Sequence, residues 1–324
     1  EEEVVLEGSG SRAIAPGDAL SVLTFNIGYG GLDADTDFFM DGGSAVLATS
    51  KEKVESNISG VGDILTRENT DVVFLQEVDL DSKRSWNVNE AELLAGRLSD
   101  WSMAYGVNYR CRYIPYPWPM MGKVEGGLVM YNALAAENTA VRKALPGSFS
   151  WPVSMCQLKR CLLVERVPLE GTEQELVLVN LHLEAYDSDG GGKKAQTKVL
   201  YELLQREYEK GNYVIAGGDF NQTFDTVPED LYPLKFTDHF MPGRIDTSVL
   251  GEGWTFANDV SAPTSRLLNE PYDPDSENTQ YYMLDGFILS PNVTLTAVKT
   301  LDEGFAYTDH NPVRVDVVLD TQND

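Results

Sequence analysis

The chain has 324 residues, 42% of them hydrophobic, and a formal net charge of −26. It is long enough to bury one large core. Acidic surfaces repel polyanions, because nucleic-acid affinity rests largely on Lys and Arg that neutralise phosphates, so tight non-specific nucleic-acid binding is disfavoured. No apolar run reaches about 18 residues, so the sequence predicts no membrane-spanning helix.

The sequence begins at Glu1 with three glutamates and no Met. We therefore expect that an upstream segment was removed and that residues 1–20 are a tail or the remnant of a tether, which keeps a secreted or membrane-tethered extracellular location open. The remainder contains no Gly/Ser-rich or Pro-rich linker, so residues 21–320 are predicted to form a single, monomeric domain. Three cysteines, Cys111, Cys156 and Cys161, allow at most one disulfide and leave the redox compartment open.

Short apolar runs bounded by polar or Gly residues recur along the chain and are typical of buried strands, because they are rich in β-branched side chains. In chain order they are Ser21–Asn26, Asp71–Val78, Gly127–Tyr131, Cys161–Val167, Glu175–His182, Tyr213–Gly218, Met283–Leu289 and Val313–Val318. Two segments between them, Ser44–Glu68 and Ala195–Tyr208, place apolar residues with a period of about 3.6 and are predicted to be helices. This mixture predicts a layered α/β protein with mixed sheets.

Two long stretches, Tyr109–Gly126 and Thr237–Gln280, show neither pattern and are predicted to be loops that determine substrate specificity. The first contains Tyr113–Met121, rich in Pro and aromatic residues, which is either a flap that touches a membrane or covers a substrate, or a loop packed on its neighbours; we favour packing. In the second stretch, Arg266 is a candidate substrate contact, although a surface salt bridge is the commoner role for such a residue.

Polar residues follow the apolar strands at their carboxyl ends, where side chains can project into a common cleft. They are Asn26, Glu77, His182, Asp219 with Asn221, Asp285, and Asp309 with His310. Hydrolysis of a phosphoester needs neutralised phosphate oxygens, a positioned water and a stabilised leaving oxygen. Carboxylates such as Glu77 and Asp309 suit Mg²⁺, and a carboxylate such as Asp285 can fix the tautomer of a nearby histidine. The sequence therefore predicts a metal-dependent phosphoester hydrolase.

The motifs that hold these residues resemble those of the endonuclease/exonuclease/phosphatase superfamily, which includes DNase I-like nucleases, inositol polyphosphate 5-phosphatases and neutral sphingomyelinases. They are Thr24-Phe25-Asn26, Leu75-Gln76-Glu77, Asn180-Leu181-His182, Gly218-Asp219-Phe220-Asn221, Leu284-Asp285-Gly286 and Thr308-Asp309-His310-Asn311-Pro312-Val313. The resemblance implies a DNase I-like four-layer α/β sandwich, with two packed mixed β-sheets flanked by helices and the site at one end of the sheets.

The same resemblance implies a role for each residue. Glu77 would be the principal ligand of Mg²⁺, or of Mn²⁺ in its place, helped by Asn26 and Asp309. Asp219 would position or deprotonate the attacking water, with Asn221 beside it. His310, paired with Asp285, would contact the scissile phosphate, and His182 would bind it from the other side or protonate the leaving group. Either Asp219 or the Asp285–His310 pair would act as the base, and we favour Asp219.

Two further features have alternative interpretations. Lys193 and Lys194 follow a glycine-rich segment at the start of a predicted helix, so they either help to bind phosphate or form a solvated basic pair. His239 follows Asp238 but lacks the strand that follows Asp309 and His310, and is interpreted as part of a loop. We expect a Mg²⁺-dependent phosphodiesterase or phosphatase that acts on a small-molecule, membrane-lipid or nucleotide phosphoester. The alternatives are a DNase-like endo- or exonuclease and a binding module without activity.

Overall fold

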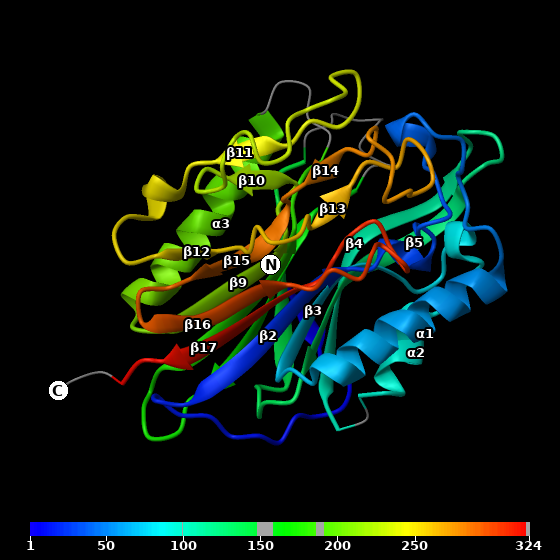
Figure 1. Ribbon diagram of the computed structural model, residues 1–324. Helices are drawn as coiled ribbons and strands as arrows, with labels where there is room; N and C mark the ends of the chain where they lie inside the picture. The colour runs from blue at the N-terminus through cyan, green and yellow to red at the C-terminus, as the bar shows by residue number, and fades with distance from the viewer. Residues whose placement is uncertain (99, 148–157, 186–190, 322–324) are drawn as a thin grey trace.

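The computed structural model describes residues 1–98, 100–147, 158–185 and 191–321. Its described part contains two large mixed sheets packed face to face (Figure 1). The seven-stranded sheet has the order β1 (Glu2–Val5), β6 (Thr139–Ala144), β7 (Cys161–Pro168), β8 (Glu175–His182), β9 (Tyr213–Asp219), β15 (Asp285–Leu289) and β12 (Thr255–Ala257). The six-stranded sheet has the order β16 (Val293–Thr300), β17 (Val313–Leu319), β2 (Ala19–Asn26), β3 (Val72–Asp79), β5 (Gly122–Asn132) and β4 (Ser102–Ile114).

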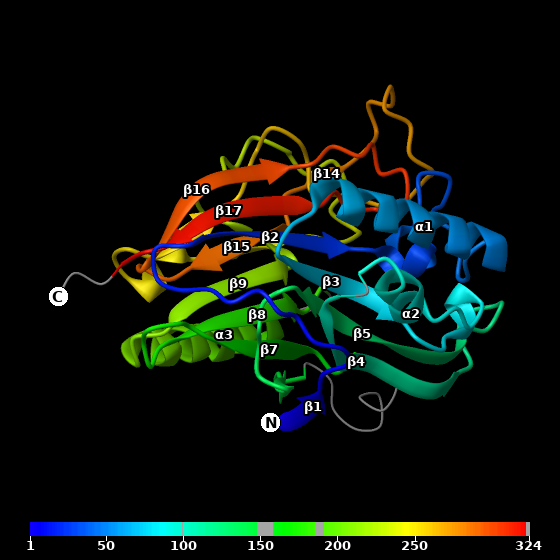
Figure 2. The ribbon, with the colours of Figure 1, turned by 90° about the horizontal axis from the view of Figure 1, so that it is seen from below.

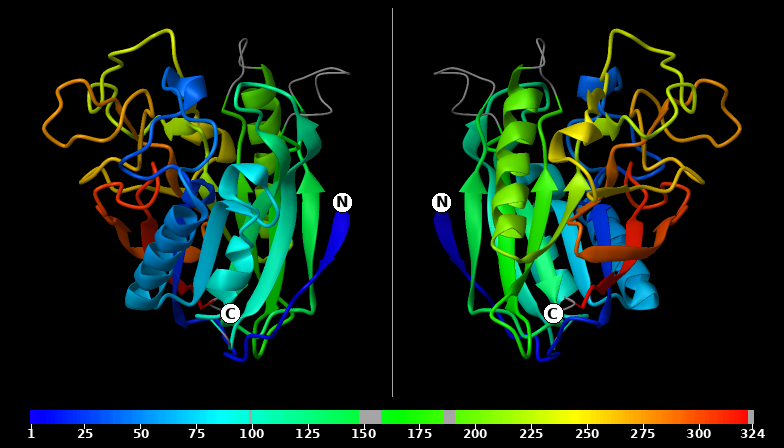
Figure 3. Two further views of the ribbon diagram at one scale, coloured as in Figure 1. Left: turned by 90° about the vertical axis from the view of Figure 1, so that its right-hand side faces the viewer. Right: turned by 90° about the vertical axis from the view of Figure 1, so that its left-hand side faces the viewer.

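Helices cover the outer faces of both sheets, which confirms the predicted four-layer α/β sandwich (Figures 2 and 3). The helices α1 (Lys51–Glu68) and α2 (Glu90–Ala95) pack on the six-stranded sheet, and α3 (Gly191–Glu209) packs on the seven-stranded sheet. The predicted helix from Ser44 begins only at Lys51, because Ser50 caps it by accepting a hydrogen bond from the backbone N–H of Lys53.

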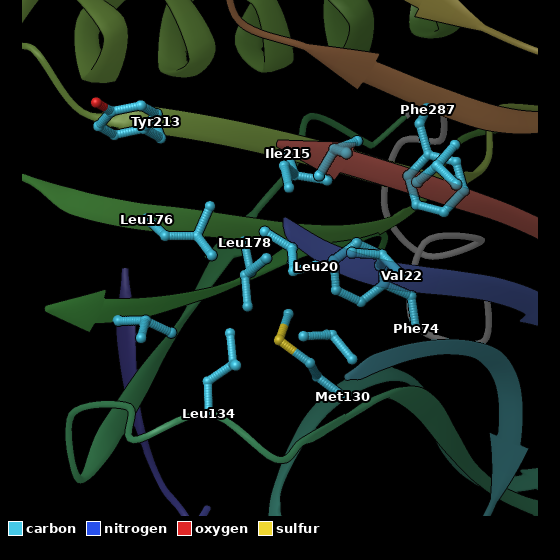
Figure 4. Packing of buried hydrophobic residues seen from close by; sticks show 14 of the residues in the cluster. Leu20, Val22, Phe74, Met130, Leu134, Leu176, Leu178, Tyr213, Ile215 and Phe287 are labelled. Atoms are coloured by element: carbon cyan, nitrogen blue, oxygen red, sulfur yellow. The ribbon is translucent and has the colours of Figure 1, made fainter. Parts of the chain in front are cut away.

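The core between the sheets is built from alternate residues of facing strands (Figure 4). Leu20 and Val22 of β2 and Phe74 of β3 meet Leu178 of β8 and Ile215 of β9, all nearly or fully buried. Neighbouring residues of the same strands point to the opposite face and pack against the helices. A sheet buried on both faces explains why these strands are continuous apolar runs in the sequence.

Two parallel strand pairs bring the polar strand ends together. The pairs β2–β3 and β8–β9 are parallel and end in register, with Asn26 beside Gln76 and His182 beside Asp219. The strand β15 runs antiparallel to β9 and begins with Asp285 opposite Asp219. All of these ends lie at one end of the sandwich, which positions the site there.

Residues 1–20, expected to be a tail, are instead built into the domain. The strand β1 pairs with β6, Glu7 bridges to Met103, and Ile14 is buried in the core between the sheets. The apolar side chains that this segment contributes explain its docking. Among the described residues, no helix is both long enough and apolar enough to cross a membrane.

The stretch Tyr109–Gly126, predicted to be a loop, is mostly a long hairpin between β4 and β5. Side chains of β4 alternate between buried and more exposed positions. Its buried face includes Ser102, Gly106 and Asn108 and its more exposed face includes Met103 and Tyr105, so apolar character does not follow burial in the sequence. Only residues 115–121 form the tip. Met121 at its base is buried, whereas Tyr116 is 71% and Trp118 is 84% exposed, so the apex lacks the predicted packing on neighbouring loops.

The second predicted loop, Thr237–Gln280, also contains short regular elements. It includes β11 (Gly243–Ile245), which pairs with β10 (Gln222–Phe224), and β13 (Ser265–Arg266), which pairs with β14 (Tyr281–Tyr282). An isolated bridge between Ser265 and His310 brings this segment to the strand ends. His239 lies in a loop, as predicted, and a side chain at Gly42 would meet its ring.

Candidate active site

Asp219 lies at the centre of the polar cluster. Its carboxylate accepts hydrogen bonds from the Asn26 side chain, at 3.0 Å, and from the backbone N–H of Asn221, at 2.8 Å. Burial and the neighbouring Asp285 raise the pKa of Asp219 to about 6. Gly218 precedes it because a side chain there would clash with the backbone oxygen of Leu181 on the adjacent strand.

His310 and Asp285 form the predicted pair. The distance between His310 Nδ1 and Asp285 Oδ2 is 2.8 Å, and both side chains are buried. Burial alone would lower the pKa of His310, but the carboxylates of Asp285 and Asp309 outweigh it and raise that pKa well above the usual value. Ser265 Oγ lies 3.3 Å from the other ring nitrogen. His310 is therefore an imidazolium held in a fixed orientation.

His182 has the opposite charge state. Its Nε2 lies 3.4 Å from Asp219, but its buried Nδ1 has no hydrogen-bond partner. Burial, followed by the positive charge of Arg160, lowers its pKa well below the usual value. Asp219 thus lies between a neutral histidine and a charged one.

Glu77 and Asp309 are the predicted metal ligands, and their environment fits a divalent cation. Glu77 lies in a β-bulge with a left-handed backbone (φ 54°), which turns its 25%-exposed side chain toward the cleft. Burial, with a contribution from the negative charge of Glu77, raises the pKa of Asp309 to about 7, although the charge of His310 acts in the opposite direction. Carboxylates of this kind are suitable ligands for Mg²⁺.

Asn26, also predicted as a metal ligand, contacts the carboxylates of the site. Its side-chain nitrogen faces Asp219 and, at 3.4 Å, Glu77, while its oxygen accepts the backbone N–H of Gly28. A second set of groups able to hold a metal is Asp219, Asp285 and His310, whose ligand atoms lie within 4.8 Å of one another. The mutual hydrogen bond and the protonation of His310 favour proton handling for this set. Asn221, predicted beside Asp219, bonds the backbone oxygen of Leu183.

Two of the three predicted substrate contacts, Arg266 and Lys193, are buried. Arg266 is buried and donates to the backbone oxygens of Asp33 and Thr36, so it is neither an exposed contact nor a surface salt bridge. Lys193 is also buried, with its Nζ 3.2 Å from the backbone oxygen of Met241. Lys194 is exposed on the first turn of α3. Of the glycine-rich segment, Asp189 and Gly190 lie outside the described residues, as does Cys156, whereas Gly191 and Gly192 begin α3.

Several residues near the site carry no recognisable motif and were not predicted. Tyr29 is buried beside Glu77 and Asp309, and Arg84 lies over its ring at 3.8 Å. Arg84 also forms two 2.9 Å hydrogen bonds with Asp79, two residues after Glu77. Arg160, which directly precedes β7, lies close enough to His182 for its charge to act on that histidine. The one available signal was the position of Arg160 just before a predicted strand.

The fold and the site together define a DNase I-like α/β sandwich with a cluster of carboxylates and histidines at one end of its sheets. A sequence profile of the Endonuclease/Exonuclease/phosphatase family matches residues 23–310. The chain therefore belongs to this family, whose members are generally phosphoester hydrolases. A comparison with curated protein sequences found no match.

Solved structures of similar fold include an endonuclease/exonuclease/phosphatase from Beutenbergia cavernae, with 18% identity and a TM-score of 0.64 over 93% of this chain and 72% of that one. Truncated TDP2 from Caenorhabditis elegans has 15% identity and a TM-score of 0.58 over 94% and 99% of the two chains. TDP2 from D. rerio, solved with a single-strand DNA product, has 16% identity and a TM-score of 0.54 over 93% and 99%. At these identities the likeness concerns the fold.

Proposed function

We propose that the protein is a Mg²⁺-dependent hydrolase of phosphoesters carried by small molecules, lipids or nucleotides. The observation that carries the proposal is the placement of Asp219 between neutral His182 and charged His310, with Glu77 and Asp309 on the same cleft. This cluster combines a base, phosphate-binding groups and cation ligands, which are the parts that phosphoester hydrolysis requires.

In the proposed mechanism, Glu77 and Asp309 hold Mg²⁺, which when bound neutralises charge on the phosphoryl oxygens. Asp219, held by Asn26 and the Asn221 N–H, accepts a proton from the attacking water. Its pKa of about 6 is close to working pH, which suits a general base. His310, oriented by Asp285, donates to a phosphoryl oxygen, and His182 binds the phosphoryl group from the other side.

The charge state of His310 supports the choice of Asp219 as base. A base must be unprotonated before the reaction, and the surrounding carboxylates keep His310 protonated. Asp219 becomes available above a pKa of about 6. The Asp285–His310 pair is therefore better suited to stabilise negative charge on the phosphate than to activate water.

The test is turnover of bis-p-nitrophenyl phosphate with Mg²⁺, with Mn²⁺ and after chelation, in the wild type and in Asp219→Asn. Asp238→Asn is the matched control, since it makes the same change at an 81%-exposed position. We expect chelation or Asp219→Asn to abolish most turnover, and Asp238→Asn to leave it unchanged. Turnover that survives both treatments would refute the proposal.

The substrate class is tested separately with sphingomyelin, an inositol phosphate, a nucleotide and plasmid DNA. Nuclease activity is the alternative, favoured by the fold that the chain shares with the DNA-bound TDP2 structure and opposed by its net charge of −26. Preference for plasmid DNA over the small and lipid substrates would establish the alternative.

A further inference from the structure

Arg160 is a buried cation for which the described part of the chain provides no side-chain partner. It is 4% exposed, and its Nε and Nη1 atoms are buried without a hydrogen-bond partner. Among the described residues, no carboxylate lies within 4.0 Å of its guanidinium group. Burial of a charge is unfavourable unless a partner compensates it, so this arrangement calls for an anion.

Two other buried arginines near the site have acceptors within the protein for their guanidinium groups. Arg84 is held by the two oxygens of Asp79, each at 2.9 Å. Arg266 donates to several backbone oxygens, the nearest being that of Asp33 at 2.8 Å. Arg84 is compensated by a carboxylate, and Arg266 by backbone oxygens at both of its terminal nitrogens, although its Nε has no partner. Arg160 has no such acceptor among the described residues for its Nε and Nη1.

The position of Arg160 is next to the proposed phosphate site. It directly precedes β7, and Leu162 of that strand pairs with Leu181 of β8, so Arg160 lies beside the point where the chain leaves His182. The backbone N–H of Lys159 donates to the backbone oxygen of Asn108, which holds this segment against β4. The charge of Arg160 lowers the pKa of His182 more than that of His310 does, which agrees with this proximity.

We propose that Arg160 is a substrate-binding residue that donates hydrogen bonds to an anionic phosphoryl oxygen on the His182 side of the cleft. The inference rests on the proposed function and extends it, since it adds a contact that no motif of the sequence indicates. A guanidinium group suits this task, because its planar set of donors matches two phosphate oxygens at once. A neutral His182 beside it avoids a second unpaired cation in the same buried space.

Phosphate binding tests the proposal without turnover. We would measure the affinity for inorganic phosphate by calorimetry, and the melting temperature with and without phosphate, at constant Mg²⁺. Arg160→Met should weaken phosphate binding at least tenfold and lose most of the stabilisation that phosphate gives the wild type. Without phosphate it should melt at or above the wild-type temperature, because an unpaired buried charge has been removed. Arg160→Lys, which keeps the charge but not the planar donors, should fall between.

Arg166→Met is the matched control. Arg166 lies on β7, the strand that Arg160 directly precedes, but it forms ion pairs with Glu175 and Glu207. This variant should melt below the wild type and keep its phosphate affinity. If Arg160→Met instead melts lower and binds phosphate as the wild type does, Arg160 is structural and the proposal is wrong.

Kinetics then locate the contact and separate the two proposals. In Arg160→Met, a larger rise in KM for p-nitrophenyl phosphate than for bis-p-nitrophenyl phosphate would show that Arg160 contacts the oxygen that carries the additional charge of a monoester. Equal rises would show that it contacts oxygens common to both esters. No rise in either KM would refute the contact. If phosphate binds through Arg160 but neither ester is hydrolysed, the hydrolase proposal fails while the phosphate subsite stands.

Discussion

The molecule buries polar side chains in two places, and they are satisfied to different degrees. In the interior between the sheets, Gln76 donates to Thr24 and Asn180, and Asn180 donates to the backbone oxygens of Leu75 and Val129. At the cleft end, His182 Nδ1, Asp285 Oδ1 and two nitrogens of Arg160 are buried without partners. The interior Gln76–Asn180 network connects the sheets, whereas the cleft keeps donors and acceptors for a ligand.

Unpaired buried atoms also occur elsewhere, for example Glu165 Oε2 between the sheets, so neither burial nor a single unpaired atom identifies function. The difference is that several unpaired donors and acceptors lie together with the carboxylates at the strand ends. Substitutions in the cleft should therefore reduce activity by orders of magnitude with little loss of stability. Substitutions between the sheets should change stability instead. The predictions below test this contrast, in order of decreasing effect.

The largest effect is expected from Glu77→Gln. Loss of the carboxylate removes a cation ligand, and several kcal/mol of transition-state stabilisation correspond to a rate loss of about 10³-fold or more. The fold should persist, because Glu77 is partly exposed and its removal relieves repulsion with Asp309. The control is Glu125→Gln, a similarly exposed carboxylate that pairs with Arg110. Measurements of kcat/KM and of melting temperature test this prediction. Full activity of Glu77→Gln in excess Mg²⁺ would refute the assignment of Glu77 as a metal ligand.

A smaller loss, of about 10²-fold, is expected from Asp285→Asn, because a general acid–base or charge-stabilising group is misoriented but not removed. Asp285 helps to hold the pKa of His310 well above its usual value. Activity that needs the imidazolium falls as pH rises through that pKa, so the alkaline limb should move to lower pH in the variant. An alkaline limb that stays in place would contradict the proposed role of the pair.

Much of the site could be predicted, because each motif places one side chain at the end of an apolar strand, and strand ends meet. The parallel pairs β2–β3 and β8–β9 make Asn26, Glu77, His182 and Asp219 neighbours even though they are far apart in the sequence. The apolar runs predicted most of the strands of the two central sheets for the same reason.

The remainder depended on tertiary contacts that local patterns do not encode. Arg160 and Arg266 are ordinary basic residues in the sequence, and only packing shows that one is unpaired and the other bonds backbone oxygens. The β4–β5 hairpin was missed because in β4 small and polar residues lie on the buried face and apolar residues on the more exposed face. The docking of residues 1–20 depends on β6, the strand next to β1 in the seven-stranded sheet, which the sequence also failed to indicate.

Between the sheets, Glu165 provides a prediction about stability. Burial raises its pKa to about 7, although Asn132 donates to it at 2.8 Å. Because the folded protein holds this proton to higher pH than the unfolded chain, stability should fall as pH rises from about 4.5 to 7, by about 3 kcal/mol for the full shift. Glu165→Gln removes the titration and should be more stable than the wild type at pH 8. Chemical denaturation at pH 5 and 8 measures this; equal pH dependence in both proteins would contradict it.

The smallest effect is expected at the hairpin tip. Tyr116 and Trp118 are largely exposed, and the contact of Tyr116 with Phe39 is a single edge-to-face pair at 6.3 Å. Replacing both aromatic residues by Ala should therefore change the free energy of unfolding by only about 0.5 kcal/mol, as for other surface positions. Hydrolysis of bis-p-nitrophenyl phosphate should not change, because the tip bears none of the cleft residues.

If the tip contributes to substrate choice, the double variant should lower the rate on sphingomyelin vesicles a few-fold relative to the aryl diester, since exposed aromatic rings favour a membrane interface. The control is Val249→Ala, another exposed apolar residue, on a 3₁₀ helix outside the hairpin. The ratio of the two rates is the informative quantity, because a general loss of folded enzyme lowers both rates equally and leaves it unchanged. An unchanged ratio with two reduced rates would show that the tip supports the structure and does not select the substrate.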